Sequence, residues 1–298
     1  MNLLTLDIGG TKTAAAWWQA GQRVLRRELP TPGHANDLLP LIGRLVEGAP
    51  AVQRVGAAIT GTTDGRRVGA LNRHMMAGWD GFALADRLEA LLDVPAVLLN
   101  DAQAAAWGEY GVRRDGVRDL MFVTVSTGLG AGLVLDGQLR TGMSGLAGHL
   151  GHTVAGTAQG GAMATPAGWA CSCGRVGCLE RRASGTALQQ DLAAQGLGDR
   201  EARQWLSEPH SHQDALAQWV GQATQALAQA IGDAQALLDL QCVLLGGGLG
   251  LNPRFFAALQ EAIVQLPVRF QVPLAQAQLG ADAGLAGMAR WLQADDGT

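Results

Sequence analysis

The chain has 298 residues, a net charge of −4 and a hydrophobic fraction of 48%. This composition excludes a disordered chain, and the scattered basic residues exclude the basic stripe that a nucleic-acid groove needs. The first residues lack the basic region of a signal peptide, and the apolar runs are far shorter than the about 20 residues that span a membrane. We therefore expect a cytoplasmic protein whose partners include neither nucleic acid nor a membrane.

The opening segment is apolar and β-prone, and its glycine turns predict an antiparallel meander. Strands and amphipathic helices then alternate. The elements expected in chain order are strands at 2–8, 13–19 and 23–29, a helix at 36–47, a strand at 53–60, a helix at 82–92, a strand at 95–99 and a helix that follows Asn100-Asp101.

A second cycle of strand, glycine turn, strand, turn and strand begins near residue 119 and repeats the opening order. We expect two related α/β domains that face a cleft, namely 1–117, joined by the last helix 281–298, and 118–280. The later elements expected are a helix at 211–238, a strand at 241–245, a helix at 253–265, a strand at 268–272 and a helix at 281–293.

Three glycine-rich turns each follow a predicted strand. Glycine lets the backbone approach a phosphate group and point its N–H groups at it. A tight hairpin also needs glycine and the Walker A pattern is absent, so each turn alone is a weak signal. Together they predict a phosphate site made by Asp7, Gly9, Gly10, Thr11, Lys12 and Thr13, by Thr127, Gly128, Gly130 and Gly132, and by Gly246, Gly247 and Gly248.

Three of the four cysteines form the pattern C-x-C-x4-C. In a reducing compartment such a cluster indicates metal ligands more often than disulfides. Cys171, Cys173 and Cys178 can close on one tetrahedral Zn²⁺ with a fourth ligand, for which His149 and His152 are both candidates. Because four protein ligands leave no open position, this zinc is expected to be structural.

The pair Asn100-Asp101 lies where a strand gives way to a helix. Position alone favours an N-cap role for Asp101 over a functional role. A cap environment would also keep its carboxylate ionised.

The motifs DIGGTKT, STGLGAG, Asn100-Asp101 and CSCGRVGCLE resemble those of the ROK family of bacterial sugar kinases and repressors. The resemblance covers nearly the whole chain. It implies a two-domain, actin-like ATPase fold of the ribonuclease-H-like type. Repressors of the family carry an N-terminal helix-turn-helix domain, whereas this sequence opens on its first strand, so the resemblance favours a kinase that uses ATP with Mg²⁺.

The resemblance also implies residue roles. The family's matching aspartate is the general base, which assigns that role to Asp101, and the histidine of the second Gly-His pair is the zinc ligand, which selects His152. Between His152 and Cys171 the chain is longer than the family usually shows, with the extra residues in 155–168. A homodimer is implied as well, and the apolar helix 215–231 is a candidate interface. The sugar contacts expected are Gly61, Asn72, Asn100, His149, His152 and Glu180, the last held by the zinc segment 149–180.

The resemblance implies that the substrate is N-acetyl-D-mannosamine, phosphorylated on its 6-hydroxyl as in sialic acid catabolism. Glucose-directed relatives usually carry a glutamate three residues before the ligand histidine, where this chain has His149. A neutral imidazole can donate as well as accept, which suits an acetyl carbonyl. The alternatives are a glucokinase, a fructokinase or another hexosamine kinase of the family, and a sugar-responsive regulator without catalysis.

Overall fold

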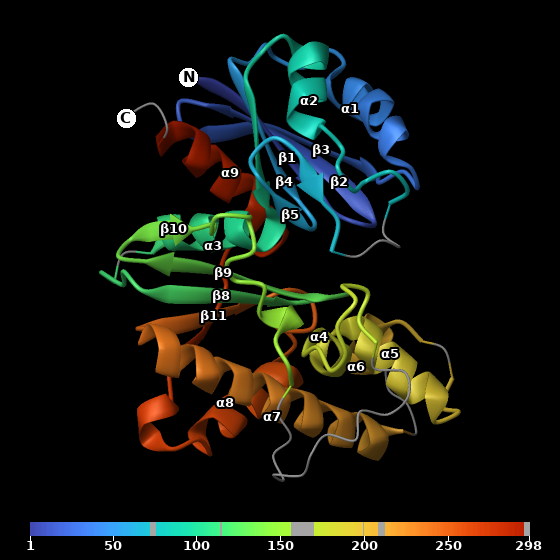
Figure 1. Cartoon of the computed structure of the whole chain (residues 1–298), viewed down its shortest axis with the longest axis vertical. Helices are drawn as coiled ribbons and strands as arrows, with labels where there is room; N and C mark the ends of the chain where they lie inside the picture. Colours follow the sequence, from blue (N-terminus) through green and yellow to red (C-terminus); the bar gives the residue numbers. More distant parts are fainter. Residues whose placement is uncertain (72–75, 114, 156–169, 199, 208–211, 295–298) are drawn as a thin grey trace.

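The computed structural model describes residues 1–71, 76–113, 115–155, 170–198, 200–207 and 212–294. In this part of the chain, two five-stranded mixed sheets lie one above the other with helices between and outside them (Figure 1). The first sheet has the order β3-β2-β1-β4-β7, from β1 (Asn2–Ile8), β2 (Lys12–Gln19), β3 (Gln22–Pro30), β4 (Arg54–Ile59) and β7 (Ala96–Asn100).

The second sheet repeats this design in the order β10-β9-β8-β11-β12. Its meander and its parallel strands β8 and β11 correspond to the meander and the parallel strands of the first sheet. The strands are β8 (Leu120–Val125), β9 (Leu129–Leu135), β10 (Gln138–Arg140), β11 (Cys242–Gly246) and β12 (Leu274–Gln276).

The outer faces of the two sheets are covered by separate apolar cores. Helices α1 (Leu38–Val46) and α2 (Leu84–Leu92) bury their apolar sides on the first sheet. Helices α7 (Gln213–Leu238) and α8 (Pro253–Val264) do the same beneath the second sheet. Smaller elements complete the fold: a 3₁₀ turn η1 (Ala35–Asp37), the hairpin β5 (Thr62–Thr63) and β6 (Val68–Gly69), η2 (Leu150–His152), α4 (Glu180–Ala183), α5 (Gly185–Ala194), α6 (Ala202–Ser207), η3 (Val268–Phe270) and η4 (Gly280–Asp282).

Two helices cross between the sheets. Each helix follows a strand of one sheet but packs on the other sheet. Helix α3 (Asp101–Val112) follows β7 of the first sheet but packs on β8 and β9, whereas α9 (Ala283–Ala294) follows β12 of the second sheet but packs on β1 and β4. The crossing is close, because a side chain at Gly287 would clash with the carbonyl of Ala104. The halves of the molecule are therefore joined through this helix pair.

Most of the strands and helices expected from the sequence are confirmed within one or two residues. The strand expected at 268–272 is wrong, since the chain there forms η3 and the strand comes later, as β12. Prolines at 267 and 273 flank this segment, and a proline has no N–H to give to a ladder. Val268 is 80% exposed, so this β-branched residue is not part of a buried strand although its type suggested one.

Helix α7 does not offer the apolar interface that the sequence suggested for 215–231. Its apolar side chains, among them Trp219, Leu227 and Ile231, lie in the core under the second sheet. The outward positions instead carry glutamines such as Gln222 and Gln225.

Within the described ranges, no helix combines the length and the apolar character that crossing a membrane requires.

Candidate active site

The first site residues lie at one edge of the first sheet. Strands β1, β4 and β7 run parallel, with Ile8 beside Ile59 and Ile59 beside Asn100. Their carboxyl ends therefore bring Asp7, Thr60 and Asp101 to the same edge, the usual place for ligands in α/β folds. Thr60 Oγ1 donates a 3.2 Å hydrogen bond to Asp101 Oδ2, so the sequence-predicted Asp101 has a partner that sequence reasoning missed.

Asn100, not Asp101, is the N-cap of helix α3. Its side-chain oxygen accepts hydrogen bonds from the backbone N–H groups of Ala102 and Gln103 at 3.0 and 3.1 Å. Its amide nitrogen donates to Gly61 O and to Asp101 Oδ1, both at 2.9 Å. The cap role favoured by position alone is thus wrong for Asp101, because the residue before it already satisfies the helix end.

The two carboxylates at this edge are both shifted toward the protonated form. Burial, with a further contribution from the charge of Asp101, raises the pKa of Asp7 to about 7. Burial also raises the pKa of Asp101, against the lowering effect of hydrogen bonds from Ala102 N, Thr60 and Asn100. Desolvation is thus the larger effect on the pKa of Asp101, whereas the hydrogen bonds at the helix start favour the ionised carboxylate that the sequence led us to expect.

The first glycine turn presents some of its predicted residues to solvent and hides others. Gly10, Thr11 and Lys12 are exposed. Lys12 Nζ lies 3.1 Å from Glu28 Oε2 in an ion pair at the surface. Because such a pair contributes little stability, it leaves Lys12 free to exchange Glu28 for another anion.

Thr13, in contrast, is fully buried, with Oγ1 2.8 Å from Thr31 Oγ1. Thr31 Oγ1 donates its proton to Gly9 O at 2.7 Å, so Thr13 must be the donor to Thr31. The hydroxyl of Thr13 is therefore bound to Thr31 inside the turn and does not face a ligand. Thr31 is a second residue that the sequence did not single out.

The second glycine turn joins β8 to β9 at the matching edge of the second sheet. Ser126 and Thr127 are exposed there, as a phosphate-binding turn requires. Gly132 is instead buried on β9, and a side chain on it would meet Ala106 of α3 at 2.7 Å. Gly130 also faces α3, with Ala102 nearby. Close packing of α3 on this strand, not a phosphate group, explains these last two glycines.

The third glycine run lies beside the second, since β8 and β11 are parallel neighbours. Leu249 N and Gly250 N both donate to Val125 O at 3.0 Å, which fixes the run against the end of β8. Gly246 is buried in β11, Gly247 has the positive φ of 82° that ends the strand, and Gly248 is exposed. Gly248 is thus the most accessible of the three predicted residues.

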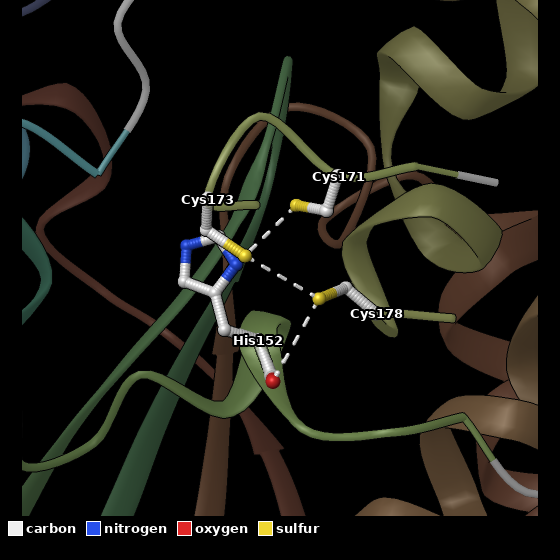
Figure 2. A group of neighbouring side chains, drawn as sticks. All are labelled: His152, Cys171, Cys173 and Cys178. Carbon is white, nitrogen blue, oxygen red and sulfur yellow. Dashed lines mark hydrogen bonds between the residues drawn. The ribbon is translucent and has the colours of Figure 1, made fainter. Parts of the chain in front are cut away.

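The predicted metal ligands converge. The ligand atoms of His152, Cys171, Cys173 and Cys178 all lie within 4.8 Å of one another (Figure 2). His152 Nδ1 is 3.6 Å from Cys171 Sγ, and Cys173 Sγ is 3.6 Å from Cys178 Sγ. Tetrahedral ligands about 2.3 Å from a zinc ion stand about 3.8 Å apart. Three thiols and one imidazole at this spacing are the donor set that Zn²⁺ prefers.

His149 does not join this group but lies next to it. Its ring is nearly parallel to that of His152, with centroids 6.2 Å apart. Burial lowers the pKa of His149, which keeps the ring neutral at pH 7. Nδ1 is 3.1 Å from Leu146 O, and a carbonyl can only accept, so Nδ1 carries the proton and Nε2 is an acceptor. With this tautomer Nε2 accepts, whereas the donation to an acetyl carbonyl expected from the sequence requires the proton on Nε2.

Glu180 opens α4 and contacts the second glycine turn, since its Oε2 accepts a 3.0 Å hydrogen bond from Leu129 N.

Gln103 is another residue that sequence reasoning missed. It is fully buried on α3, and its amide nitrogen donates to the carbonyls of Thr141, Gly145 and Ala147 at 3.2, 3.2 and 2.9 Å. It thus holds the loop that leads to His149. The predicted sugar contact Asn72, and nearly all of 155–168, lie outside the described residues.

Comparison with known proteins gives full-length matches. Residues 3–295 match the ROK family. The chain is 42% identical to the N-acetylmannosamine kinases of Salmonella heidelberg (strain SL476) and Salmonella typhimurium, and each match covers 99% of both chains.

Solved structures agree with this assignment. A ROK family glucokinase from Streptomyces griseus, solved with glucose and AMPPNP, is 27% identical with a TM-score of 0.79, and the match covers 98% of this chain and 99% of that one. A ROK hexokinase from Thermus thermophilus is 30% identical with a TM-score of 0.79, over 99% and 100% of the two chains. These likenesses confirm the expected α/β class and the actin-like ATPase fold.

Proposed function

Because the chain belongs to the ROK family, we propose that it is an ATP-dependent sugar kinase that phosphorylates N-acetyl-D-mannosamine on its 6-hydroxyl group. One observation of the structure carries this proposal. The half-buried carboxylate of Asp101 lies at the sheet edge where the ends of β1, β4 and β7 meet, held by Thr60 and Asn100. The full-length similarity to kinases named for this sugar supports the substrate.

Asp101 acts as the general base. Phosphoryl transfer depends mainly on alignment and on neutralising charge, so the base takes the proton late, as the sugar hydroxyl attacks the terminal phosphate. Both amide protons of Asn100 already serve Gly61 and Asp101. Asp101 Oδ2 accepts from Thr60 and keeps a lone pair for the sugar hydroxyl, whereas Asn100 can contact the sugar only by giving up one of its two bonds.

ATP lies between two domains, 1–117 with 281–298 and 118–280, which enclose the cleft. Its phosphates contact the exposed Gly10 to Lys12 and the exposed Ser126 and Thr127, and its adenosine lies near Gly248. Asp7 would lie beside the Mg²⁺ that accompanies ATP, an ion that would be held mainly by phosphate oxygens and water and would supply charge neutralisation. The turns belong to matching edges of the two sheets, which supports one nucleotide reaching both.

His152, Cys171, Cys173 and Cys178 would hold a structural zinc ion. With four protein ligands such an ion would order this segment and would leave no open position for a substrate. The spacing of the ligand atoms supports this assignment.

His149 contributes to substrate choice as an acceptor. With Nδ1 committed to Leu146 O, Nε2 can accept the N–H of a 2-acetamido group. The glutamate of glucose-directed relatives would offer two charged acceptors at this position, which suits a pair of hydroxyls better. A neutral single acceptor therefore favours an acetamido sugar.

A coupled assay for ADP release tests the proposed class. Purified protein with ATP should release ADP only when both Mg²⁺ and N-acetyl-D-mannosamine are present. Addition of a chelator should stop the reaction. Sugar binding without ADP release would instead indicate a regulator and would contradict the proposal. The same preparation tests for a homodimer, since light scattering should give twice the chain mass.

A further inference from the structure

The turn at Ser126–Leu129 is held by hydrogen bonds from one segment of the chain, residues 180–186. Gly185 N donates to Ser126 O at 2.7 Å. Thr186 donates to Thr127 O twice, through its backbone N–H at 3.0 Å and its hydroxyl at 2.8 Å. Glu180 Oε2 accepts from Leu129 N at 3.0 Å. The exposed side of the turn is thus left for a ligand, while its rear is fixed.

Glu180 lies directly under this turn. A side chain at Gly128 would come within 2.7 Å of Glu180 Oε2, so the carboxylate occupies the space that a larger residue would need. Glu180 is only two residues after Cys178, and Leu179 N donates to Thr153 O at 2.9 Å. The segment that carries His152 and the one that carries Glu180 are therefore fastened together next to the metal ligands.

We propose that Glu180 is a positioning residue for the nucleotide: its carboxylate fixes the phosphate-binding turn through Leu129 N and so sets the affinity for ATP before any sugar binds. This inference rests on the proposed function, and it adds to the sugar contact that the resemblance implies for Glu180. A turn that is already ordered loses less conformational entropy when a phosphate group binds, which strengthens binding.

The test measures binding of Mg-AMPPNP by titration calorimetry in the absence of sugar. Glu180→Ala should weaken binding about tenfold, because a hydrogen bond to a charged acceptor typically contributes that much. Glu180→Gln should weaken binding less than Glu180→Ala does, since its neutral amide oxygen can still accept from Leu129 N. Glu261→Ala, at an exposed position of α8, is the matched control and should change nothing.

Glu180→Asp provides a second variant if the alanine variant does not fold. It keeps the charge but is one methylene too short to reach Leu129 N, so the inference expects weakened binding. Equal affinity of the unaltered protein, Glu180→Ala and Glu180→Asp would overturn the inference and leave the proposed function in place. A failure of the unaltered protein to bind Mg-AMPPNP would remove the proposed function and this inference with it.

Discussion

Asp101 is the residue on which the proposed chemistry depends. Asp101→Asn keeps the shape of the side chain and an oxygen that can accept from Ala102 N, but it removes the base. Loss of a general base typically costs 10²–10⁴-fold, so kcat should fall by about that factor. The affinity for the sugar, measured by calorimetry, should change little. Turnover close to normal would show that Asp101 is not the base.

Asp7 should make the stability of the nucleotide-free protein depend on pH. Its pKa is about 7 in the folded protein, whereas an unfolded aspartate titrates near ~3.9. The folded state binds this proton more tightly, so the contribution of Asp7 to the free energy of unfolding is lost as the pH rises from about 4 to about 7.

Asp7→Asn should therefore raise Tm at pH 8 and change it less at pH 5, as calorimetry can measure. Asp233→Asn, at an exposed position of α7, is the control and should show no such difference. An equal effect of Asp7→Asn at both pH values would mean that the aspartate is ionised throughout this range.

The sequence could predict the three cysteine ligands because they belong to a compact motif of chemically distinctive residues. The choice of His152 and the role of Asp101 came from the family resemblance, and the role of Asp101 stays a prediction. The sequence could not show that Asn100 takes the cap, since both residues are good caps and only the chain path decides between them. The sequence predicts that Thr13 faces a ligand. Its hydroxyl instead pairs with Thr31, which directly follows β3, and a motif limited to residues 7–13 cannot reveal this partner. The tautomer of His149 likewise depends on a carbonyl that only the fold supplies.

At the scale of elements, the metal-binding segment should depend on its ion. Purified protein should contain about one zinc per chain, and Cys173→Ser should lose the metal because zinc binding is coupled to folding of such a segment. A loss of a few kcal/mol should lower Tm by roughly 5 °C or more in a chain of this size.

The matched control is Cys242→Ala, which alters the fourth cysteine in the buried strand β11. It should keep the zinc although it too loses some stability through poorer packing. Protein that contains no zinc as purified, or a Cys173→Ser variant that retains it, would contradict the assignment.

Strands and long helices could be predicted because burial imposes a clear apolar pattern on them. The glycines on β9 misled the interpretation, since Gly132 is required by α3 packing and the sequence does not reveal which helix covers which strand. The small elements α4 to α6 were missed, because short helices are held by tertiary contacts more than by their own pattern.

At the scale of the whole molecule, sugar binding should close the two halves. Helices α3 and α9 join the halves by a close crossing, and the predicted ligand-binding residues lie on both sheets. Small-angle scattering should show a smaller radius of gyration when N-acetyl-D-mannosamine is added. An unchanged radius at a saturating sugar concentration would indicate a rigid cleft.

The repeated order of strands predicted two similar units, and two sheets of the same design are present. The exchange of α3 and α9 between the sheets could not be predicted, because it depends on contacts between residues 183 positions apart along the chain, such as Ala104 and Gly287. The domain bounds proposed from the sequence stay a prediction.

The most direct test of the central claim is a competition for limiting Mg-ATP. Equal concentrations of N-acetyl-D-mannosamine, N-acetyl-D-glucosamine and glucose are supplied together, and the phosphorylated products are identified by nuclear magnetic resonance. The product ratio then reports the ratio of kcat/KM values, and a site that pairs with an acetamido group disfavours a sugar that lacks it. We predict that N-acetyl-D-mannosamine 6-phosphate predominates; predominance of glucose 6-phosphate, or a phosphate on another hydroxyl, would contradict the account.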